Sequence, residues 1–275
     1  MEKPWIICRT SCDGIGNVMK AFISALSVNP LSRVQTNPDY SLGHYELVLH
    51  PRHVHLGEIE GDAEPFYTCR LLVLTDEEND QPYLADGQWN VPPFTTGNPK
   101  LDACDFFSKR SVIDWNYSNE RLCAQLCERV DRVTDSIEFL PEITERVEQT
   151  LRNFQGLPLL GVSVRTWKAP HEKNINRAYD PNVYMKAIVK ELPNVAGVFI
   201  SVDHHEEAEI YASFLRDKAA NVNILEWKDC DPLQEAFLKA LVLSRCQVVV
   251  GSRQSTFLEL VYWFSKRKAR IVPLF

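Results

Sequence analysis

The second half of the chain alternates between short apolar runs and longer segments with helical periodicity. The apolar runs, which predict strands, lie at 157–164, 198–202, 222–225 and 247–251. Apolar residues that recur every three or four positions predict helices over 181–192, 206–218, 232–244 and 256–264. Strands that alternate with helices form a parallel, doubly wound sheet. The pattern therefore predicts a Rossmann-like α/β lobe in this half.

The first half shows a similar but less regular pattern. Trp5–Cys8 is a short apolar run, a glycine turn follows it, and the apolar residues from Val18 to Leu26 have helical spacing. Strand, turn and helix in this order again indicate an α/β lobe. Two further strands are predicted at 45–49 and 70–74, and two further helices at 118–133 and 141–154.

The stretch at 76–98 has no period and is rich in Pro, Gly and Asp, which predicts a long loop that is either functional or mobile. The apolar strand that begins at Leu157 starts a new series of elements, so we place the lobe boundary just before it. The fold class predicted is α/β with two Rossmann-like lobes. The N-terminal lobe covers 1–155, and the C-terminal lobe, a parallel doubly wound sheet, covers 156–275.

Composition narrows the function classes. The chain of 275 residues is 45% hydrophobic and carries 30 Lys and Arg against 37 Asp and Glu, for a net charge of −7. A chain without a global basic field is not expected to bind nucleic acid or an anionic membrane surface. No apolar run approaches the roughly 18 residues of a membrane span. We expect a complete, soluble, cytoplasmic protein.

Two groups of potential metal ligands lack the pattern of a metal site. The eight cysteines include no Cys-x-x-Cys pair, so zinc is not expected, and in a reducing compartment they act as small buried hydrophobes. The histidines of His50-Pro51-Arg52-His53-Val54-His55 alternate as on a half-exposed strand edge. We expect no metal ion at either group.

A third group leaves the metal question open. Asp229-Cys230-Asp231 has the Asp-x-Asp spacing with which metal-dependent sugar transferases hold a divalent ion. Asp231-Pro232 with Glu235 also predicts the N-cap, first-turn proline and early acid of the next helix. We favour the capping interpretation and keep the metal ion as its alternative.

Polar residues follow several of the predicted strands, where ligands of parallel sheets bind. After the first strand, Gly14-Ile15-Gly16 lets the backbone approach a ligand, and the helix start that follows offers N–H groups and a positive dipole end to an anion. A turn without a ligand is the alternative. Because the third glycine and the acidic residue of a dinucleotide fingerprint are absent, NAD binding is disfavoured.

Two strand ends in the second half point to phosphate. Arg165 follows an apolar strand, where a guanidinium needs a carboxylate or phosphate partner, and Asp203 on a neighbouring strand is the alternative partner. Ser255 or Thr256 is a predicted N-cap with Glu259 as a capping-box partner. The same helix start is also predicted to bind phosphate beside Arg165.

These motifs together resemble the fucosyltransferase superfamily, which includes α-1,2 and α-1,6 enzymes, rhizobial nodulation fucosyltransferases and protein O-fucosyltransferases. Asp13-Gly14-Ile15-Gly16-Asn17 resembles the family's Gly-x-Gly-Asn turn, and Gly161-Val162-Ser163-Val164-Arg165 resembles its Gly-Val-His-x-Arg-Arg strand. The segment from Leu243 to Phe257 is similar to its terminal strand and Ser-rich helix start. The three motifs keep the family's order along nearly the whole chain.

The resemblance implies an inverting, metal-independent glycosyltransferase of the two-lobe GT-B type, with the donor mainly on the C-terminal lobe. It implies that Asn17 and Arg165 hold the donor diphosphate, that Ser255 adds a phosphate hydrogen bond, and that Asp203 lies on the nucleotide side. The other donor-binding candidates belong to the same motifs: Gly14, Ile15, Gly16, Ser163 and Thr256.

The motif after the middle strand departs from the family. Ser163 replaces the family's His, Thr166 replaces its second Arg, and Trp167-Lys168 replaces the acidic residue that follows. Nucleotide and sugar contacts cluster there, so the donor stays open between GDP-fucose and a UDP-sugar such as UDP-xylose. No cofactor is implied beyond this nucleotide-sugar co-substrate.

The predicted reaction is a direct displacement at the anomeric carbon by a hydroxyl of an oligosaccharide or glycoconjugate. Arg165 and two helix N-termini would stabilise the departing diphosphate without a metal ion. Asp13, beside the glycine turn of the acceptor-side lobe, is the predicted base, with an Asx turn as its alternative role. His171 and Glu172 are reserve candidates. A nucleotide-sugar-binding protein without catalysis is the second functional hypothesis, and a Rossmann oxidoreductase is disfavoured.

Overall fold

A computed structural model describes residues 5–8, 14–57, 64–67, 75–76, 81–82, 124–166, 179–218, 221–252 and 255–274. The chain divides into two compact units, and neither is one uninterrupted segment. Unit 1 comprises Met1–Glu145 and Cys230–Phe237, and unit 2 comprises Arg146–Asp229 and Leu238–Phe275. The predicted boundary between 155 and 156 stays a prediction.

Unit 1 contains a parallel sheet of four strands in the order β3-β2-β1-β4. The strands are β1 (Trp5–Cys8), β2 (Arg33–Gln35), β3 (Val54–His55) and β4 (Glu64–Tyr67). The central strand β1 pairs with β2 on one side and with β4 on the other. The first strand of the chain was predicted, whereas β2 and β4 were not.

Three helices of the chain's first 151 residues follow the predicted periodicity. Helix α1 (Ile15–Val28) begins directly after Gly14 and buries an apolar face that includes Phe22. Helix α3 (Ala124–Ser136) contacts α1, and its described part confirms the predicted helix, with its end at Ser136 instead of Val133. Helix α4 (Pro141–Leu151) continues into the 3-10 turn η4 (Arg152–Phe154).

The strand predicted at 45–49 is wrong, because this segment forms the 3-10 turn η1 (Tyr45–Leu47). The amides of Val48 and Leu49 both donate to the Tyr45 carbonyl, at 3.1 and 2.8 Å. Residues 45, 48 and 49 are buried, so the apolar side chains share one face at helical spacing instead of alternating between two faces. A short apolar run cannot distinguish these two patterns.

The predicted strand at 70–74 lies outside the described residues. Within the loop predicted at 76–98, the described residues belong to a short antiparallel pair, β5 (Thr75–Asp76) and β6 (Gln81–Pro82).

Unit 1 also takes part of its core from late in the chain. The Phe237 ring packs edge-on against Tyr45, with ring centroids 6.3 Å apart, and lies 6.0 Å from the Phe139 ring. The Gln234 side-chain amide donates to the Leu47 carbonyl at 3.0 Å. The segment Cys230–Phe237 is therefore packed into this unit, far in sequence from its partners.

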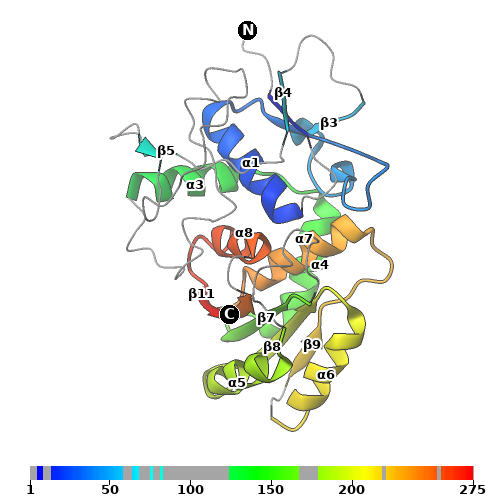
Figure 1. The fold of residues 1–275 in the computed structure, drawn as a ribbon, viewed down its shortest axis with the longest axis vertical. Coiled ribbons are helices and arrows are strands. Elements are labelled where there is room, and N and C mark those ends of the chain that lie inside the picture. Colours follow the sequence, from blue (N-terminus) through cyan, green and yellow to red (C-terminus); the bar gives the residue numbers. More distant parts are fainter. Residues whose placement is uncertain are drawn as a thin grey trace. The chain divides into compact units, whose positions relative to one another are not determined.

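Unit 2 contains a parallel sheet of five strands in the order β11-β10-β7-β8-β9. Strands β7, β8 and β9 of this sheet lie side by side in Figure 1. The strands are β7 (Leu159–Val164), β8 (Gly197–Val202), β9 (Val222–Ile224), β10 (Val248–Ser252) and β11 (Arg270–Leu274). Every residue of β7, β8 and β10 is buried, as expected for strands covered on both faces. This sheet confirms the predicted parallel α/β arrangement, to which the structure adds β11.

Helices cover both faces of the unit 2 sheet. Helices α5 (Pro181–Glu191) and α6 (His205–Leu215) pack with the apolar side chains of one face. On the opposite face, a Cβ atom built on Gly161 of β7 would lie 2.7 Å from Leu243 at the end of α7 (Pro232–Leu243). A Cβ atom on Gly251 of β10 would lie 3.0 Å from a side chain of α8 (Thr256–Phe264). The two glycines allow these helices to approach the sheet closely.

Within the described part of the chain, none of the helices has both the length and the apolar character that a membrane span requires.

Candidate functional site

The polar residues predicted to follow three strands of unit 2 lie at one edge of its sheet. Strands β10, β7 and β8 are neighbours and run parallel, so their carboxyl ends share that edge. Arg165 and Thr166 follow β7, Asp203 follows β8, and Ser252 ends β10. Arg165 is half-buried and Asp203 is exposed. A cation and an anion thus stand where ligands of parallel sheets bind.

Asp203 fastens the end of β8 to the end of β7. Its carboxylate accepts the Thr166 amide at 2.9 and 3.0 Å and the Thr166 hydroxyl at 2.7 Å. Thr166 therefore holds the Asp203 carboxylate with its amide and its hydroxyl. The role of Asp203 on the nucleotide side of a donor stays a prediction.

Tyr184 of α5 reaches the same edge and was not predicted from the sequence. Its side chain is buried, and its hydroxyl lies 2.7 Å from the Ser252 hydroxyl. The backbone amide of Arg165 also donates to the Tyr184 hydroxyl. Burial is the main cause that raises the pKa of this phenol, and the Asp203 carboxylate contributes in the same direction. Tyr184 therefore stays a neutral hydroxyl that links β7 to β10.

Two further tyrosines pack around the Tyr184 ring, and an acid holds one of them. The Tyr179 hydroxyl donates to a Glu207 carboxylate oxygen at 2.7 Å and lies 2.8 Å from the Tyr211 hydroxyl. The rings of Tyr179 and Tyr211 each have their centroid 6.0 Å from that of Tyr184. Burial raises the pKa of both surrounding phenols. In the sequence, Tyr184 and Tyr211 lie on amphipathic helices and look like ordinary core aromatics.

Ser255 caps helix α8. Its hydroxyl accepts the Leu258 amide at 3.3 Å, and its side chain is buried, which confirms the predicted N-cap. Leu258, not Glu259, occupies the third helical position, where a capping-box partner belongs. Glu259 is instead buried and accepts the Trp263 indole N–H at 3.4 Å.

The other donor-binding candidates of unit 2 also lie near this edge. Ser163, the second-last residue of β7, is buried and pairs in register with Gly251 and Ser201. Thr256 is the partly buried first residue of α8. Phosphate binding by Ser163, Ser255 and Thr256 stays a prediction.

The glycine turn of unit 1 is described from Gly14 onward. Gly14 is the exposed N-cap of α1, Ile15 and Gly16 are buried, and Asn17 is partly buried. Among the described residues other than its chain neighbours, none has an atom within 4 Å of a Cβ built on Gly14. Its φ of −77° is one that other residues also adopt. The candidate bases Asp13, His171 and Glu172 lie outside the described residues, and their roles stay predictions.

Asp229 and Asp231 each have partners within the protein. Asp229 accepts the Arg146 guanidinium at 2.8 Å, and this hydrogen bond lowers the pKa of the carboxyl. Asp231 accepts the Leu233 amide at 2.8 Å, while the Gln234 side chain accepts the Asp231 amide at 3.1 Å. This reciprocal pattern is a capping box at the start of α7. It confirms the predicted cap Asp231, whereas its partner Gln234 was not predicted. Among the described residues, no group of three His, Cys, Asp or Glu side chains could hold a metal ion.

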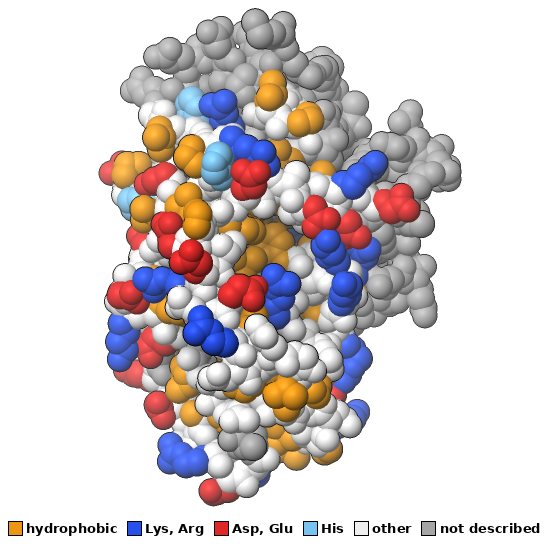
Figure 2. Space-filling model, turned by 180° about the vertical axis from the view of Figure 1, so that it is seen from behind, with side chains coloured by type: hydrophobic (Ala, Val, Ile, Leu, Met, Phe, Trp, Pro, Cys, Tyr) orange, Lys and Arg blue, Asp and Glu red, His pale blue; other side chains and the backbone are white. Residues whose placement is uncertain are grey.

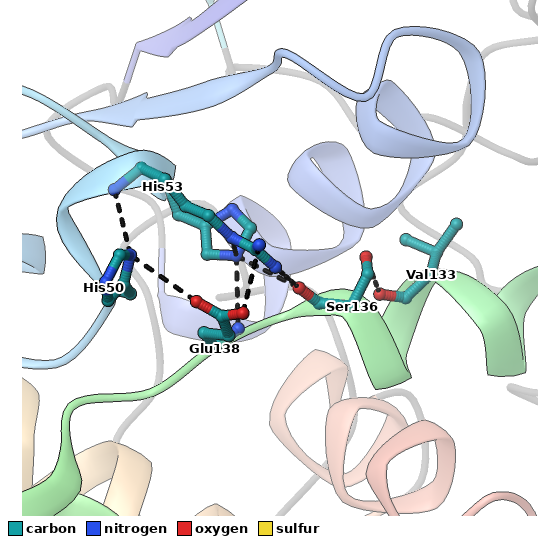
Figure 3. A network of polar contacts seen from close by, with 6 residues as sticks. His50, His53, Val133, Ser136 and Glu138 are labelled. Atoms are coloured by element: carbon teal, nitrogen blue, oxygen red, sulfur yellow. Dashed lines mark hydrogen bonds and ion pairs between the residues drawn. The ribbon is translucent and has the colours of Figure 1, made fainter.

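The histidine-rich segment of unit 1 forms a hydrogen-bond network (Figure 3). It begins with a 3-10 turn, η2 (Pro51–His53), so that only Val54 and His55 lie in a strand. The buried His53 Nε2 atom accepts the Glu138 amide at 3.1 Å and lies 3.2 Å from the Ser136 carbonyl. Arg52 donates to His53 Nε2 at 3.2 Å and forms an ion pair with Glu138 at 3.0 Å. The network fastens η2 to the segment that follows α3.

Basic and acidic side chains are interspersed over the described part of the face in Figure 2. This mixed distribution accords with the small excess of acidic residues in the sequence.

The fold and the site together define an α/β protein with two parallel sheets and a polar carboxyl edge on the second. No protein-family model and no curated relative matches the sequence. Solved structures do match. The complex of POFUT1 with GDP-fucose has a TM-score of 0.53 and 10% identity, and the match covers 99% of this chain and 98% of that one.

Two structures of the fucosyltransferase NodZ match in the same way. One, from Bradyrhizobium, has a TM-score of 0.52 and 14% identity over 100% of this chain and 96% of that one. The other is the NodZ α-1,6-fucosyltransferase co-crystallised with GDP, with a TM-score of 0.51 and 14% identity over the same shares of both chains. The chain therefore has a fucosyltransferase-like fold, which confirms the predicted fold class and the resemblance at the level of the fold.

Proposed function

We propose that the protein is a glycosyltransferase that moves a sugar, fucose or a similar one, from a nucleotide diphosphate donor to a hydroxyl of an oligosaccharide or glycoconjugate. The fold of fucosyltransferases over nearly the whole chain supports this proposal. Among the structures with this fold, one is a complex with GDP-fucose and another was co-crystallised with GDP.

The observation that carries the proposal is the position of Arg165. Arg165 directly follows the fully buried strand β7. The neighbouring parallel strand β10 leads to the α8 N-terminus. An arginine fork matches a phosphate group, and a helix N-terminus adds amide donors and a positive dipole end. We propose that these two groups bind the diphosphate of the donor.

The same groups fit the chemistry of transfer. When the acceptor hydroxyl attacks the anomeric carbon, the bond from that carbon to the diphosphate breaks and negative charge grows on the leaving oxygen. A fixed cation and fixed amide dipoles stabilise that charge without rearranging. We therefore propose an inverting, metal-independent displacement with Asp13 as the base that takes the acceptor proton.

Thr166 bears on the choice of donor. It stands where the family has an arginine, and its amide and hydroxyl are bonded to Asp203. The site therefore has one guanidinium fewer than the family's motif. In the family, contacts to the nucleotide and to the sugar are concentrated at this position. A UDP-sugar such as UDP-xylose is therefore the second candidate donor, and a binding protein without catalysis is the second candidate function.

Calorimetric titration with GDP and UDP, followed by assays of donor hydrolysis with GDP-fucose and UDP-xylose, tests the proposal. We expect one nucleoside diphosphate to bind with clear preference and the corresponding sugar nucleotide to be slowly hydrolysed in water. Tight binding with no hydrolysis and no transfer to a panel of glycan acceptors would favour the binding protein. Failure to bind either nucleotide would refute both functions.

A further inference from the structure

The buried Tyr184 hydroxyl joins the ends of β7 and β10. These two strand ends lead to the groups proposed to bind phosphate. We propose that Tyr184 is a positioning residue, which sets the spacing between the Arg165 guanidinium and the α8 N-terminus and thereby the affinity for a diphosphate. This inference rests on the proposed function and adds to it a residue that belongs to none of the three motifs of the resemblance.

The contacts of the Tyr184 hydroxyl place it between both groups. It accepts the backbone amide of Arg165, the residue whose side chain is the proposed phosphate ligand. It lies 2.7 Å from the hydroxyl of Ser252, the last residue of β10 and three positions before the α8 cap Ser255. A phenol has one proton and accepts further hydrogen bonds, so it serves both partners at once.

The surroundings of Tyr184 hold its hydroxyl in place. The side chain has no exposed surface, and the rings of Tyr179 and Tyr211 pack against its ring. Tyr179 is itself held through its hydroxyl, which donates to Glu207 and lies 2.8 Å from the Tyr211 hydroxyl. A ring enclosed in this way presents its hydroxyl at one position, so β7 and β10 are joined by a rigid link.

Tyr184→Phe removes this link and keeps the ring. The Arg165 amide and the buried Ser252 hydroxyl then lose a partner, and the two strand ends are free to separate slightly. Small displacements of a charged ligand group reduce binding steeply. We expect affinity for the nucleoside diphosphate that the wild type prefers to fall about tenfold or more. Affinity for the corresponding nucleoside, which has no phosphate, should hardly change.

Tyr211→Phe is the matched control. It also removes one hydroxyl from a fully buried tyrosine of the same aromatic group, but that hydroxyl contacts Tyr179 and not a strand end. Ser252→Ala tests the second half of the link and should weaken diphosphate binding in the same direction. The double variant Tyr184→Phe/Ser252→Ala should lose less affinity than the two single losses combined, because both remove the same contact.

Calorimetry, melting temperatures and amide hydrogen exchange at Arg165 decide the outcome. Diphosphate affinity that falls in Tyr184→Phe but not in Tyr211→Phe, with faster exchange at Arg165 only in the former, supports the proposal. Unchanged affinity in Tyr184→Phe, or equal losses in both variants that follow equal falls in melting temperature, would overturn it. If the wild type binds no nucleotide, the proposed function fails, and exchange at Arg165 still shows whether the hydroxyl holds the strand end.

Discussion

The carboxylate of Asp203 accepts both the backbone amide and the hydroxyl of Thr166, at distances of 2.7 to 3.0 Å. The preceding amide, that of Arg165, donates to the Tyr184 hydroxyl. Two successive amides after β7 are therefore held by side chains from elsewhere in the chain. The backbone at this strand end is thereby fixed on both sides. The Arg165 side chain is therefore attached to a rigid backbone. A group that stabilises a transition state has to be held in place in this way.

Arg165→Ala should weaken binding of the preferred nucleoside diphosphate by roughly 2–5 kcal/mol, the scale for loss of a charged hydrogen-bond partner in a desolvated site. Arg165→Lys should recover part of this loss, because lysine keeps the charge but not the planar fork. Calorimetric titration of both variants checks the expectation.

Arg216→Ala is the control for this change, since Arg216 is an exposed arginine of the same unit at the end of α6. It should bind nucleotide as the wild type does. If Arg165→Ala also binds normally, the guanidinium has no phosphate role.

Asp231→Asn should leave both stability and transfer activity nearly unchanged. Asparagine caps helices about as well as aspartate and can still accept the Leu233 amide. Asp231→Ala should lower the free energy of unfolding by about 0.5–2 kcal/mol, because the cap is lost. Chemical denaturation of the two variants measures the difference.

Activity measured in EDTA separates this capping role from metal binding. We expect transfer to continue in the chelator for the wild type and for Asp231→Asn. A rate that collapses in EDTA and returns with Mn²⁺, together with an inactive Asp231→Asn, would instead assign Asp229 and Asp231 as metal ligands.

Stability should fall as the pH drops below about 6.5, in part because of His53. Burial, followed by the nearby Arg52 charge, lowers the pKa of His53 from its usual 6.5. The unfolded chain therefore takes up a proton at a higher pH than the folded one. The contribution of His53 is complete above 6.5 and is lost as the pH falls toward its folded-state pKa, with a slope of up to about 1.4 kcal/mol per pH unit.

His53→Gln removes this titration and keeps a side-chain oxygen that can accept the Glu138 amide. Melting temperatures between pH 5 and 7.5 should then depend less on pH than in the wild type. His204→Gln, the same substitution at an exposed histidine, is measured beside it as the control for the substitution itself. A His53→Gln profile that coincides with that of the wild type would show that other groups cause the loss.

Asp13→Asn should lower turnover by about 10²–10⁴-fold with little change in donor affinity, if Asp13 takes the acceptor proton in the transition state. Asparagine is nearly isosteric with aspartate and can form the same Asx turn, so the melting temperature should hold. Asp13→Ala removes both the carboxylate and any Asx-turn contact. Comparing the two variants for turnover, nucleotide affinity and melting temperature separates a role as base from a role in the turn. Near-normal turnover of Asp13→Asn would direct the search for the base to His171 and Glu172.

Sequence patterns predicted unit 2 well because its strands and helices differ sharply in periodicity. The predicted helix at 256–264 coincides with α8, and Ser255 is its cap. Strand β11 was missed because only Ile271 and Leu274 of its five residues are buried and it contains Pro273. Its short length and mixed pattern resemble those of a loop.

Only part of the candidate site could be predicted from the sequence. Strand ends are visible in a sequence, so Arg165 and Asp203 could be assigned to one edge of a sheet. Tyr184 could not, because its role depends on which side chains its hydroxyl meets across the fold. The 3-10 turn at Tyr45 was missed in the same way, since the buried face of a short apolar run is decided by what packs on it.

The late contribution of Phe237 to the core of unit 1 has a consequence for biosynthesis. Domains generally fold as units, N-terminal first, while the ribosome is still at work. Unit 1 cannot complete its packing around Tyr45 and Phe139 until residue 237 has left the ribosomal tunnel. By then Arg146–Asp229 of unit 2 has already emerged. The two units should therefore finish folding at nearly the same time, and the early part of the chain has to remain unaggregated until then.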